Sequence, residues 1–394
     1  MDPWKTVYVI DFFSALNYNR VRQEQTFTGG DAMRKLRVAI IGQGRSGRDI
    51  HGLYLKTESA KERFEVAAIV EEDGSRRKRA EEEYGVPVYS SYQELFPYAS
   101  EIDLVVNSSY SVQHGPITMD LLSHGFNVLC EKPAAVSAEE FDRMCACAEE
   151  SGRELFIFQQ SRFAAYFKKV REVLDSGVLG RIIDVDIRFN GFSRRWDWQT
   201  LLFMNGGSLR NTGPHPLDQA LVILNDFDHM PDVFCRMDRV GTFGDAEDYV
   251  KLILTGKDKP LIDLTISCCD AYPCYTYKIH GQYGGLKGTM AHIDWRYYDP
   301  QIAPAQTLCR KFISKPDGTP AYCSEKLPWK EESWDGDPNA PFDQAVDEYY
   351  SNIYEHIVGG APLEVTLRQV RQQVMVYEEA HRQNQWMEET GRIL

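Results

Sequence analysis

The chain has 394 residues, of which 43% are hydrophobic, and this length and composition allow two domains with packed cores. Its formal net charge of −14 argues against a nucleic-acid partner, because phosphates are bound by basic surfaces. No apolar run approaches the ~20 residues that span a bilayer, and the nine cysteines lack zinc-ligand spacing, so we expect no membrane partner, no metal and a cytoplasmic location with reduced thiols.

The N-terminal segment does not resemble a signal peptide. Its apolar stretch VYVIDFFSAL is interrupted by Asp11, and its flanks lack a charged start and a small-residue cleavage site. Met33 stands just before the first strong strand signal. We therefore expect residues 1–34 to be an extension that precedes the first domain.

A glycine-rich turn follows the first predicted strand. Residues 38–41 are apolar, and Gly42, Gly44 and Gly47 follow at G-x-G-x-x-G spacing. The first glycine permits the tight turn, the second removes a Cβ that would collide with phosphates, and the third lets the helix pack on the strand. We expect this turn to hold a dinucleotide pyrophosphate at a helix N-terminus. The predicted cofactor contacts here are Gly42, Gln43, Gly44, Arg45, Ser46 and Gly47.

Strands and helices alternate up to about residue 158. Further strands are predicted at 64–70, 86–89, 103–107, 127–130 and 156–158, and helices at 46–56, 75–84, 91–95, 116–124 and from Ser137 onward. Such alternation is typical of a doubly wound parallel sheet. Residues 35–158 are therefore predicted to form a dinucleotide-binding α/β domain.

The pattern changes beyond residue 159. The stretches IIDVDIRFN, YVKLILTG, LIDLTISCC and YTYKIHG alternate and predict antiparallel strands of one large sheet. Helices are predicted at 166–174, 213–224, 341–357 and 367–384, whereas residues 300–340 are predicted to be surface loops. Residues 159–394 are thus predicted to form a second α/β domain with a mostly antiparallel open sheet.

An acidic residue marks the end of the second strand. Glu71 stands 24 residues after Gly47, close to the ~20-residue spacing of the acid that binds the ribose hydroxyls. A carboxylate there accepts both hydroxyl protons and repels a 2′-phosphate, which favours NAD over NADP. The basic run 76–79 is the counter-argument, but we expect it to be a solvated helix face because acids 71–73 precede it.

The fifth strand, residues 127–130, delivers Glu131, Lys132 and Pro133. In open α/β sheets, ligands bind beyond the carboxyl ends of the strands. Lys132 is therefore expected to point toward the nicotinamide end of the cleft. Pro133 stiffens this turn and is a candidate for a cis peptide bond.

Six stretches in this order resemble the Gfo/Idh/MocA oxidoreductase family: GQGRSG, VAAIVEED, NSSYSVQHGPITMDLLSHGFNVLCEKP, QQSRF, SGVLGRIIDVD and GGSLRNTGPHPLDQA. The resemblance covers roughly residues 35–390. It implies an N-terminal Rossmann domain and a C-terminal α/β domain whose open sheet commonly mediates homo-oligomerisation. It also implies hydride transfer between NAD(P) and a sugar, polyol or related carbinol.

The resemblance further implies that Lys132 lies beside the reacting carbinol and that His215 matches the family histidine. Oxidising a secondary alcohol needs a base for the hydroxyl proton and a cation for the developing alkoxide. We predict His215 as the base, with a pKa near the working pH, and Lys132 as the cation, or as a partner that shares the proton if burial lowers its pKa. Many members have Asp where this chain has Asn211, which can hydrogen-bond a hydroxyl but cannot take up a proton. If this segment is helical, Asn211 and His215 lie on one face.

Further candidates follow from the same motifs. Asn107 and Ser108 end the fourth strand, and they are expected to contact the cofactor together with His114, Glu131 and Gln160; for His114 a structural role is favoured over a cofactor contact. Arg162 is a candidate substrate ligand at the cleft mouth, or alternatively an ion-pair partner between domains. Tyr110, Trp196 and Trp198 are candidates for stacking on a sugar ring, although such a tryptophan pair also fits surface packing.

Three functions remain open at this point. The first is an NAD-dependent dehydrogenase of a sugar, glycoside or polyol. The second is an enzyme that cleaves a glycosidic bond through a transient ketone. The third is a dinucleotide-binding regulator without turnover, which only Asn211 favours, whereas the presence of both Lys132 and His215 argues against it.

Overall fold

The computed structural model describes residues 34–337 and 342–385. The unit that begins at Lys35 is compact and contains two sheets. The predicted extension lies outside the described residues except for Arg34, so it stays a prediction. All nine cysteines are described, and each is a free thiol.

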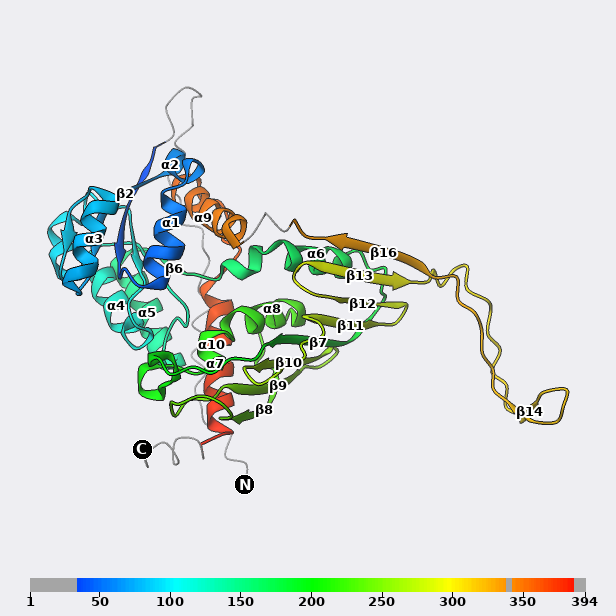
Figure 1. The fold of residues 1–394 in the computed structure, drawn as a ribbon. Coiled ribbons are helices and arrows are strands. Elements are labelled where there is room, and N and C mark those ends of the chain that lie inside the picture. Colours follow the sequence, from blue (N-terminus) through cyan, green and yellow to red (C-terminus); the bar gives the residue numbers. More distant parts are fainter. Residues whose placement is uncertain (1–33, 338–341, 386–394) are drawn as a thin grey trace. The chain divides into compact units, whose positions relative to one another are not determined.

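The first sheet has six parallel strands in the order β3-β2-β1-β4-β5-β6, which confirms the predicted doubly wound Rossmann sheet (Figure 1). The carboxyl ends of its central strands therefore meet at one edge. The strands are β1 Leu36–Ile41, β2 Phe64–Val70, β3 Val88–Tyr89, β4 Leu104–Asn107, β5 Val128–Cys130 and β6 Leu155–Ile157.

The helices around this sheet lie close to their predicted positions, with one exception. They are α3 Gly74–Tyr84, the 3-10 helices η2 Tyr92–Tyr98 and η3 Ser111–Gln113, α4 His114–Ser123 and α5 Ala138–Ser151. The exception is the helix predicted at 46–56. It is a π-helix, η1 Gly47–Gly52, followed by the single turn α1 Leu53–Leu55. A separate helix, α2 Glu58–Arg63, begins at Thr57, whose hydroxyl caps it by accepting a hydrogen bond from the amide of Ala60.

The second sheet has eight strands in the order β16-β13-β12-β11-β7-β10-β9-β8. All neighbours pair antiparallel except β7 and β10, which confirms a mostly antiparallel open sheet. The strands are β7 Ile182–Asn190, β8 Asp232–Asp238, β9 Tyr249–Thr255, β10 Leu261–Ser267, β11 Tyr277–Gly281, β12 Gly284–Gly288, β13 His292–Tyr297 and β16 Lys330–Asp335.

The prediction of only surface loops over 300–340 is wrong at β16, which pairs with β13 along its whole length. The strand escaped prediction because it lies at the sheet edge, where only Trp334 packs toward the core and the other five residues are charged or polar. A short ladder of β14 Ile313–Ser314 and β15 Pro320–Ala321 also occurs within this segment.

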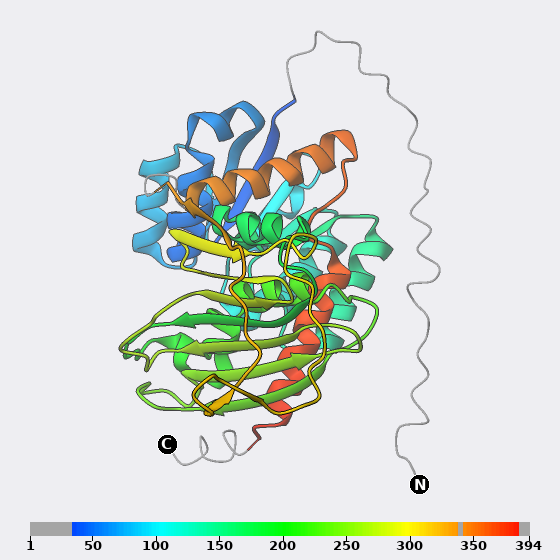
Figure 2. The same cartoon turned by 90° about the vertical axis from the view of Figure 1, so that its right-hand side faces the viewer.

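One face of the second sheet is covered by helices, as Figures 1 and 2 show. These are α6 Ala165–Asp175, α8 Pro214–Leu224 and α10 Leu367–Arg382. Phe167, Leu221 and Tyr377 from these helices form one core with the inward side chains of the strands. The connecting segments carry η4 Gln160–Phe163, η5 Trp198–Thr200, η6 Leu202–Met204 and α7 Ser208–Asn211.

The last two helices tie both sheets together. Helix α9 Phe342–Gly359 packs on the Rossmann sheet, where Tyr350 and Ile353 share a core with Ile40 of β1. Helix α10 contributes Val374 to the other Rossmann core and Tyr377 to the core of the second sheet. The predicted domain boundary near residue 158 stays a prediction. Helix α9, from the predicted second domain, packs on the sheet of the first. Among the described residues, no helix is long and apolar enough to cross a membrane.

Candidate functional site

The glycine turn after β1 needs glycine at two positions for steric reasons. Gly42 has a φ of +88°, and a Cβ there would lie 2.6 Å from the carbonyl oxygen of Ser108. A Cβ on Gly47 would lie 1.9 Å from the carbonyl oxygen of Gly42. Both glycines therefore let the turn and the following helix approach the sheet closely.

The same turn fits an anion. A Cβ on Gly44 would meet nothing within 4 Å, so the space in front of the turn is open. The first amides of the helical segment, from Gly44 to Ser46, have no intrahelical acceptor and can donate to a ligand. Arg45 is exposed beside them. These features suit the pyrophosphate of a dinucleotide.

Glu71 at the end of β2 is held in place by this turn. Its Oε2 accepts a hydrogen bond from the amide of Gln43 at 2.7 Å, and its Oε1 accepts one from the amide of Asp73 at 2.9 Å. The residue is only 7% exposed. The carboxylate is therefore fixed beside the glycine turn, at the strand end where a ribose-binding acid is expected.

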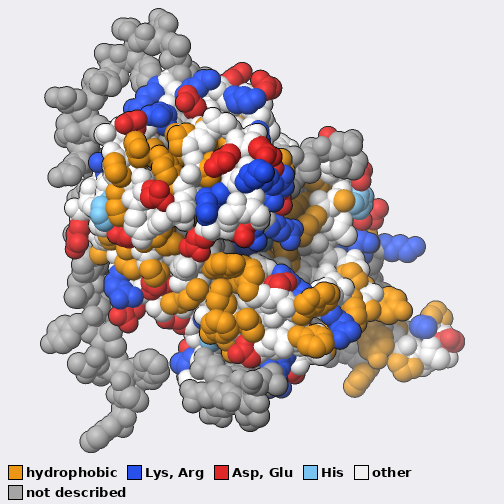
Figure 3. Space-filling model, turned by 60° about the vertical axis from the view of Figure 1, so that its left-hand side comes forward, with side chains coloured by type: hydrophobic (Ala, Val, Ile, Leu, Met, Phe, Trp, Pro, Cys, Tyr) orange, Lys and Arg blue, Asp and Glu red, His pale blue; other side chains and the backbone are white. Residues whose placement is uncertain are grey.

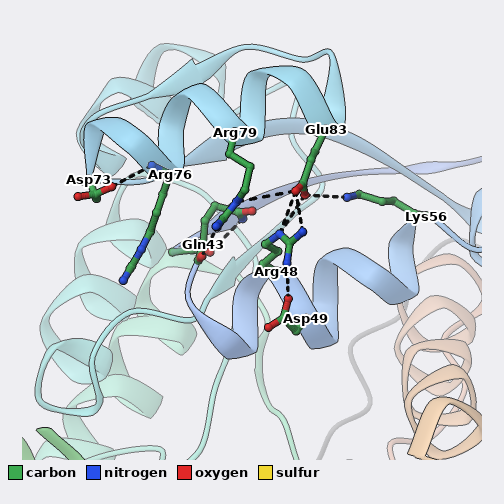
Figure 4. Close-up of polar contacts among 9 residues, drawn as sticks. Gln43, Arg48, Asp49, Lys56, Asp73, Arg76, Arg79 and Glu83 are labelled. Carbon is green, nitrogen blue, oxygen red and sulfur yellow. Dashed lines mark hydrogen bonds and ion pairs between the residues drawn. The ribbon is translucent and has the colours of Figure 1, made fainter. Parts of the chain in front are cut away.

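The basic run of α3 is largely exposed, as expected, but two of its arginines also contact the glycine turn and Glu71 (Figure 4). Arg79 donates to the carbonyl of Gln43 at 3.1 Å, and Arg76 lies 3.8 Å from Oε2 of Glu71. Below them, Arg48 and Lys56 both pair with Glu83 on α3, which ties the π-helix to α3. Two arginines thus lie beside the glycine turn and Glu71.

Lys132 extends from the end of β5 and is followed by a cis peptide bond to Pro133. Its Nζ donates a hydrogen bond to the carbonyl oxygen of Asn211, 3.0 Å away and 79 residues later in the chain. Burial lowers the pKa of Lys132, and the charges of Arg45 and Arg195 lower it further. The lysine of the Rossmann part therefore meets the segment that leads into α8.

His215 lies in the first turn of α8. Burial and the charge of Lys132 lower its pKa to about 3, so a pKa near the working pH, as predicted from the sequence, is wrong. Lys132 Nζ bonds the carbonyl of Asn211, four residues before His215, so the two residues lie close together. Neither ring nitrogen of His215 is hydrogen-bonded to any residue in the described ranges, and Nδ1 is buried. The ring is therefore available to a ligand.

Asn211 ends α7 and does not share a helix with His215. Thr212 and Gly213 between the two helices keep right-handed helical dihedrals. The amide of Gly213 donates to the carbonyl of Ser208 and that of His215 to the carbonyl of Thr212, so the regular i to i−4 pattern is interrupted and α7 and α8 are separate helices. The Asn211 side chain accepts a hydrogen bond from Gln199 Nε2 at 3.0 Å, and Gln199 in turn accepts one from Arg195. Sequence analysis did not identify Gln199 or Arg195, although it named Trp196 and Trp198 in the same loop.

A buried network under the turn also escaped prediction. Glu131 Oε2 accepts from the amide of Lys132 at 3.0 Å, while Oε1 accepts from Ser46 and lies 3.1 Å from Nε2 of His51. Nδ1 of His51 is 2.7 Å from the hydroxyl of Tyr350 on α9. Although burial alone raises the pKa of Glu131, the contacts to His51, Lys132 and Ser46 lower it to about 2. This charged carboxylate joins the pyrophosphate turn to the backbone of Lys132.

Arg162 is not at the mouth of the cleft, which corrects its assignment as a substrate ligand. It is 3% exposed and forms a buried ion pair with Asp218 of α8, with an Nε–Oδ2 distance of 3.0 Å. Its Nη1 also donates to the carbonyl of Glu364 and to Gln369. The alternative role as an ion-pair partner between the two parts agrees with this geometry. Gln160 is also buried, with no recorded partner for its Oε1 among the described residues.

Three predicted cofactor ligands hold the strand ends together instead. Asn107 is fully buried, and its amide donates to the carbonyl of His114 and to Thr118. His114 bridges the carbonyls of Pro133 and Ser109, at 2.7 and 3.2 Å. The Ser108 hydroxyl donates to the carbonyl of Ile41. The side chains of all three are satisfied within the protein, so they offer the cofactor only backbone groups.

The aromatic candidates separate into a pair and a single residue. Tyr110, beyond β4, contacts Trp198 edge to face with ring centroids 5.1 Å apart. The two parts of the chain therefore meet through these aromatic rings. Trp196 is 77% exposed and takes no part in this pair.

The Rossmann sheet, the glycine turn and the lysine beyond β5 define a dinucleotide-binding oxidoreductase. Comparison with known families agrees, since residues 36–159 match the oxidoreductase family with an NAD-binding Rossmann fold, and residues 167–287 match the GFO/IDH/MocA C-terminal domain. The chain belongs to the Gfo/Idh/MocA family, as its motifs predict.

Among similar proteins, D-glucoside 3-dehydrogenase of Escherichia coli is 31% identical over 193 residues, covering 48% of this chain and 54% of that protein. Mouse trans-1,2-dihydrobenzene-1,2-diol dehydrogenase is 29% identical over 224 residues, covering 56% and 64%. The chain thus matches about half the length of these relatives. A solved NAD-binding protein from Listeria innocua has a TM-score of 0.71 at 19% identity, covering 89% of this chain and 99% of that one.

The WlbA dehydrogenase from Bordetella pertussis was solved in complex with NADH and UDP-GlcNAcA. Its structure gives a TM-score of 0.70 at 19% identity, covering 89% of this chain and 97% of that one. At these identities the structural matches establish the fold alone. They place the chain among proteins of the same two-part architecture.

Proposed function

We propose that this protein is an NAD-dependent dehydrogenase that oxidises a secondary alcohol of a sugar, glycoside or polyol. The observation that carries the proposal is the contact between Lys132 Nζ and the Asn211 carbonyl. It brings the end of β5 and the start of α8, with His215, to one space beyond the carboxyl edge of the Rossmann sheet. The printed names of the relatives, a glucoside dehydrogenase and a diol dehydrogenase, support a carbinol substrate.

In this proposal, Lys132 is the base and His215 is a hydrogen-bond donor, whereas the sequence prediction made His215 the base. Because the pKa of His215 is lowered to about 3, its imidazole is neutral and a weak proton acceptor at working pH. A neutral ring can instead donate its N–H to the carbinol oxygen. Lys132 has a pKa below its ordinary value and, in its neutral form, takes the hydroxyl proton. The resulting ammonium then hydrogen-bonds the product carbonyl oxygen.

Bound NAD supplies the hydride acceptor in this scheme. Residues 42–47 would bind the pyrophosphate, and Glu71 the hydroxyls of the adenosine ribose. Preference for NAD over NADP is part of the proposal, since a fixed carboxylate repels a 2′-phosphate. Arg76 and Arg79 oppose this preference, but Arg79 is engaged with the Gln43 carbonyl and Arg76 lies beside Glu71 itself.

The test is an absorbance assay for reduced nicotinamide with a panel of sugars, inositols and glycosides. We expect turnover with at least one compound, at a rate that rises with pH as Lys132, whose pKa is lowered by burial, loses its proton. Lys132→Met and His215→Asn should each lower kcat by about 10²- to 10⁴-fold while nucleotide binding persists. Lys61→Met, at an exposed position on α2, is the matched control.

Full activity in Lys132→Met would contradict this mechanism. Release of an aglycone without net formation of reduced cofactor would favour glycoside cleavage through a transient ketone. Nucleotide binding with no turnover of any compound in the panel would favour a regulatory protein.

A further inference from the structure

A long arm projects from the edge of the second sheet. It comprises residues 300–328, between β13 and β16, and Figure 1 shows it extending away from the body of the molecule. Its only regular structure is the two-residue ladder of β14 and β15. Almost every side chain in it is exposed: Phe312 fully, Tyr322 to 90% and Leu308 to 77%. Apolar side chains are visible on this projection at the lower right of Figure 3.

The base of the arm is well anchored. Trp329, just after the arm, packs edge to face on Tyr298, just before it, with ring centroids 5.8 Å apart. Arg296 lies over the Trp329 ring at 4.9 Å, and Tyr298 also contacts Tyr283. These contacts fix where the two legs leave the sheet. The contacts at its base therefore fix the direction in which the arm leaves the sheet.

The arm has the composition of a contact surface rather than of a solvated loop. The pairing of Ile313 with Ala321 places Phe312 opposite Tyr322 at the next position of the hairpin. Two aromatic side chains thus stand at one cross-strand position with no core to enter. A lone hairpin of this kind is marginally stable in water, and aromatic rings dominate the energetics of interfaces. Their burial requires a second surface.

Charge and reach both point to another copy of this chain as that surface. The arm carries Arg310, Lys311, Lys315 and Lys326 against Asp317 and Glu325, so its net charge is +2, whereas the rest of the chain carries −16. The positively charged arm is therefore attracted to the negatively charged remainder of another copy of this chain. Each leg has about 14 residues and can span roughly 45 Å when extended, enough to cross a neighbouring domain.

The body also offers apolar positions for such a contact. On the sheet face opposite α8 and α10, Phe234 of β8 is 60% exposed and Leu261 of β10 is 38% exposed. We propose that the arm clasps a second copy of this chain and buries Leu308, Phe312 and Tyr322 against it. The family resemblance implies a homo-oligomer formed through the open sheet. The proposal adds to it a contact that the arm of each copy makes with another copy. The proposal does not depend on the substrate or the cofactor.

The first test measures molecular mass by sedimentation over a range of concentrations, with the full chain. We expect the wild-type protein to associate. In a variant with Leu308→Ser, Phe312→Ser and Tyr322→Ser, the concentration below which the oligomer dissociates should be at least tenfold higher than in wild type. Tyr272→Ser, at an exposed aromatic in another loop, is the matched control and should leave association unchanged. Retained nucleotide binding and circular dichroism verify that the variants are folded.

The second test uses wild type alone and needs no variant to fold. A sample that mixes unlabelled and 15N-labelled chains is treated with a zero-length carbodiimide cross-linker. We expect Lys311 or Lys315 to be joined to a carboxylate of a chain with the other label. A monomeric wild type, an unchanged mass of the triple variant, or arm cross-links confined to single chains would each overturn the proposal.

Discussion

The buried ion pair between Arg162 and Asp218 allows the sharpest test of how the two parts of the chain are joined. Arg162 follows β6, Asp218 lies in α8, and their side chains are only 3% and 4% exposed. Replacing Arg162 by Met leaves the Asp218 carboxylate buried without a counter-charge. Breaking such a pair from one side costs about 3–5 kcal/mol of unfolding free energy.

The structure adds a smaller contribution to this cost. Nη1 of Arg162 also donates to the Glu364 carbonyl and to Gln369, and an orphaned buried acceptor costs about 1–3 kcal/mol. The double variant Arg162→Met, Asp218→Leu removes the unpaired charge, so it should recover most of the loss but not this remainder. The two contributions together cost about 4–8 kcal/mol. At about 2 °C per kcal/mol, the single variant should lower the midpoint of thermal unfolding by roughly 8–16 °C.

Calorimetry and denaturant unfolding measure this effect, and a double-mutant cycle isolates the pair. The matched control is Arg371→Met, which breaks a half-exposed pair between α10 and Asp142 of α5 and should cost under about 1 kcal/mol. The reasoning is refuted if Arg162→Met keeps wild-type stability while KM for the substrate rises many-fold. That result would return Arg162 to the cleft as a substrate ligand.

Three further predictions concern the cofactor turn and the buried histidine. Gly47→Ala forces a Cβ against the Gly42 carbonyl and should abolish nucleotide binding, measured by NADH fluorescence; wild-type affinity would contradict the assigned packing. Glu71→Ala should lower the ratio of kcat/KM for NAD over NADP at least tenfold, whereas Glu72→Ala should not, and equal ratios would show that other residues set the preference. Because the folded pKa of His215, about 3, lies below its unfolded value of about 6.5, its contribution to stability is complete above pH 6.5 and is lost as pH falls toward 3. His215→Gln should therefore flatten the fall in unfolding free energy across this range, and an unchanged slope would show that the histidine ionises normally.

The sequence by itself determined the Rossmann half of the molecule. Alternating strands and helices, the glycine spacing, Glu71 at the end of β2 and Lys132 after β5 are local patterns. Each lies where it was expected, except that the helix predicted at 46–56 is divided. They are readable because the carboxyl ends of parallel strands meet at one edge. Local pattern therefore sufficed to bring the candidate cofactor and catalytic residues to a common edge.

Only the tertiary structure decided the features that depend on distant partners. The edge strand β16 is polar and becomes a strand through its pairing with β13. In the sequence, Arg162 cannot be told apart from a substrate-binding arginine; its ion pair with Asp218 of α8 is seen only in the folded structure. The low pKa of His215 arises from burial and from Lys132, 83 residues away in the chain. The sequence specifies which side chain stands at each position. Its protonation state, burial and contacts depend on chain segments that meet only in the folded protein.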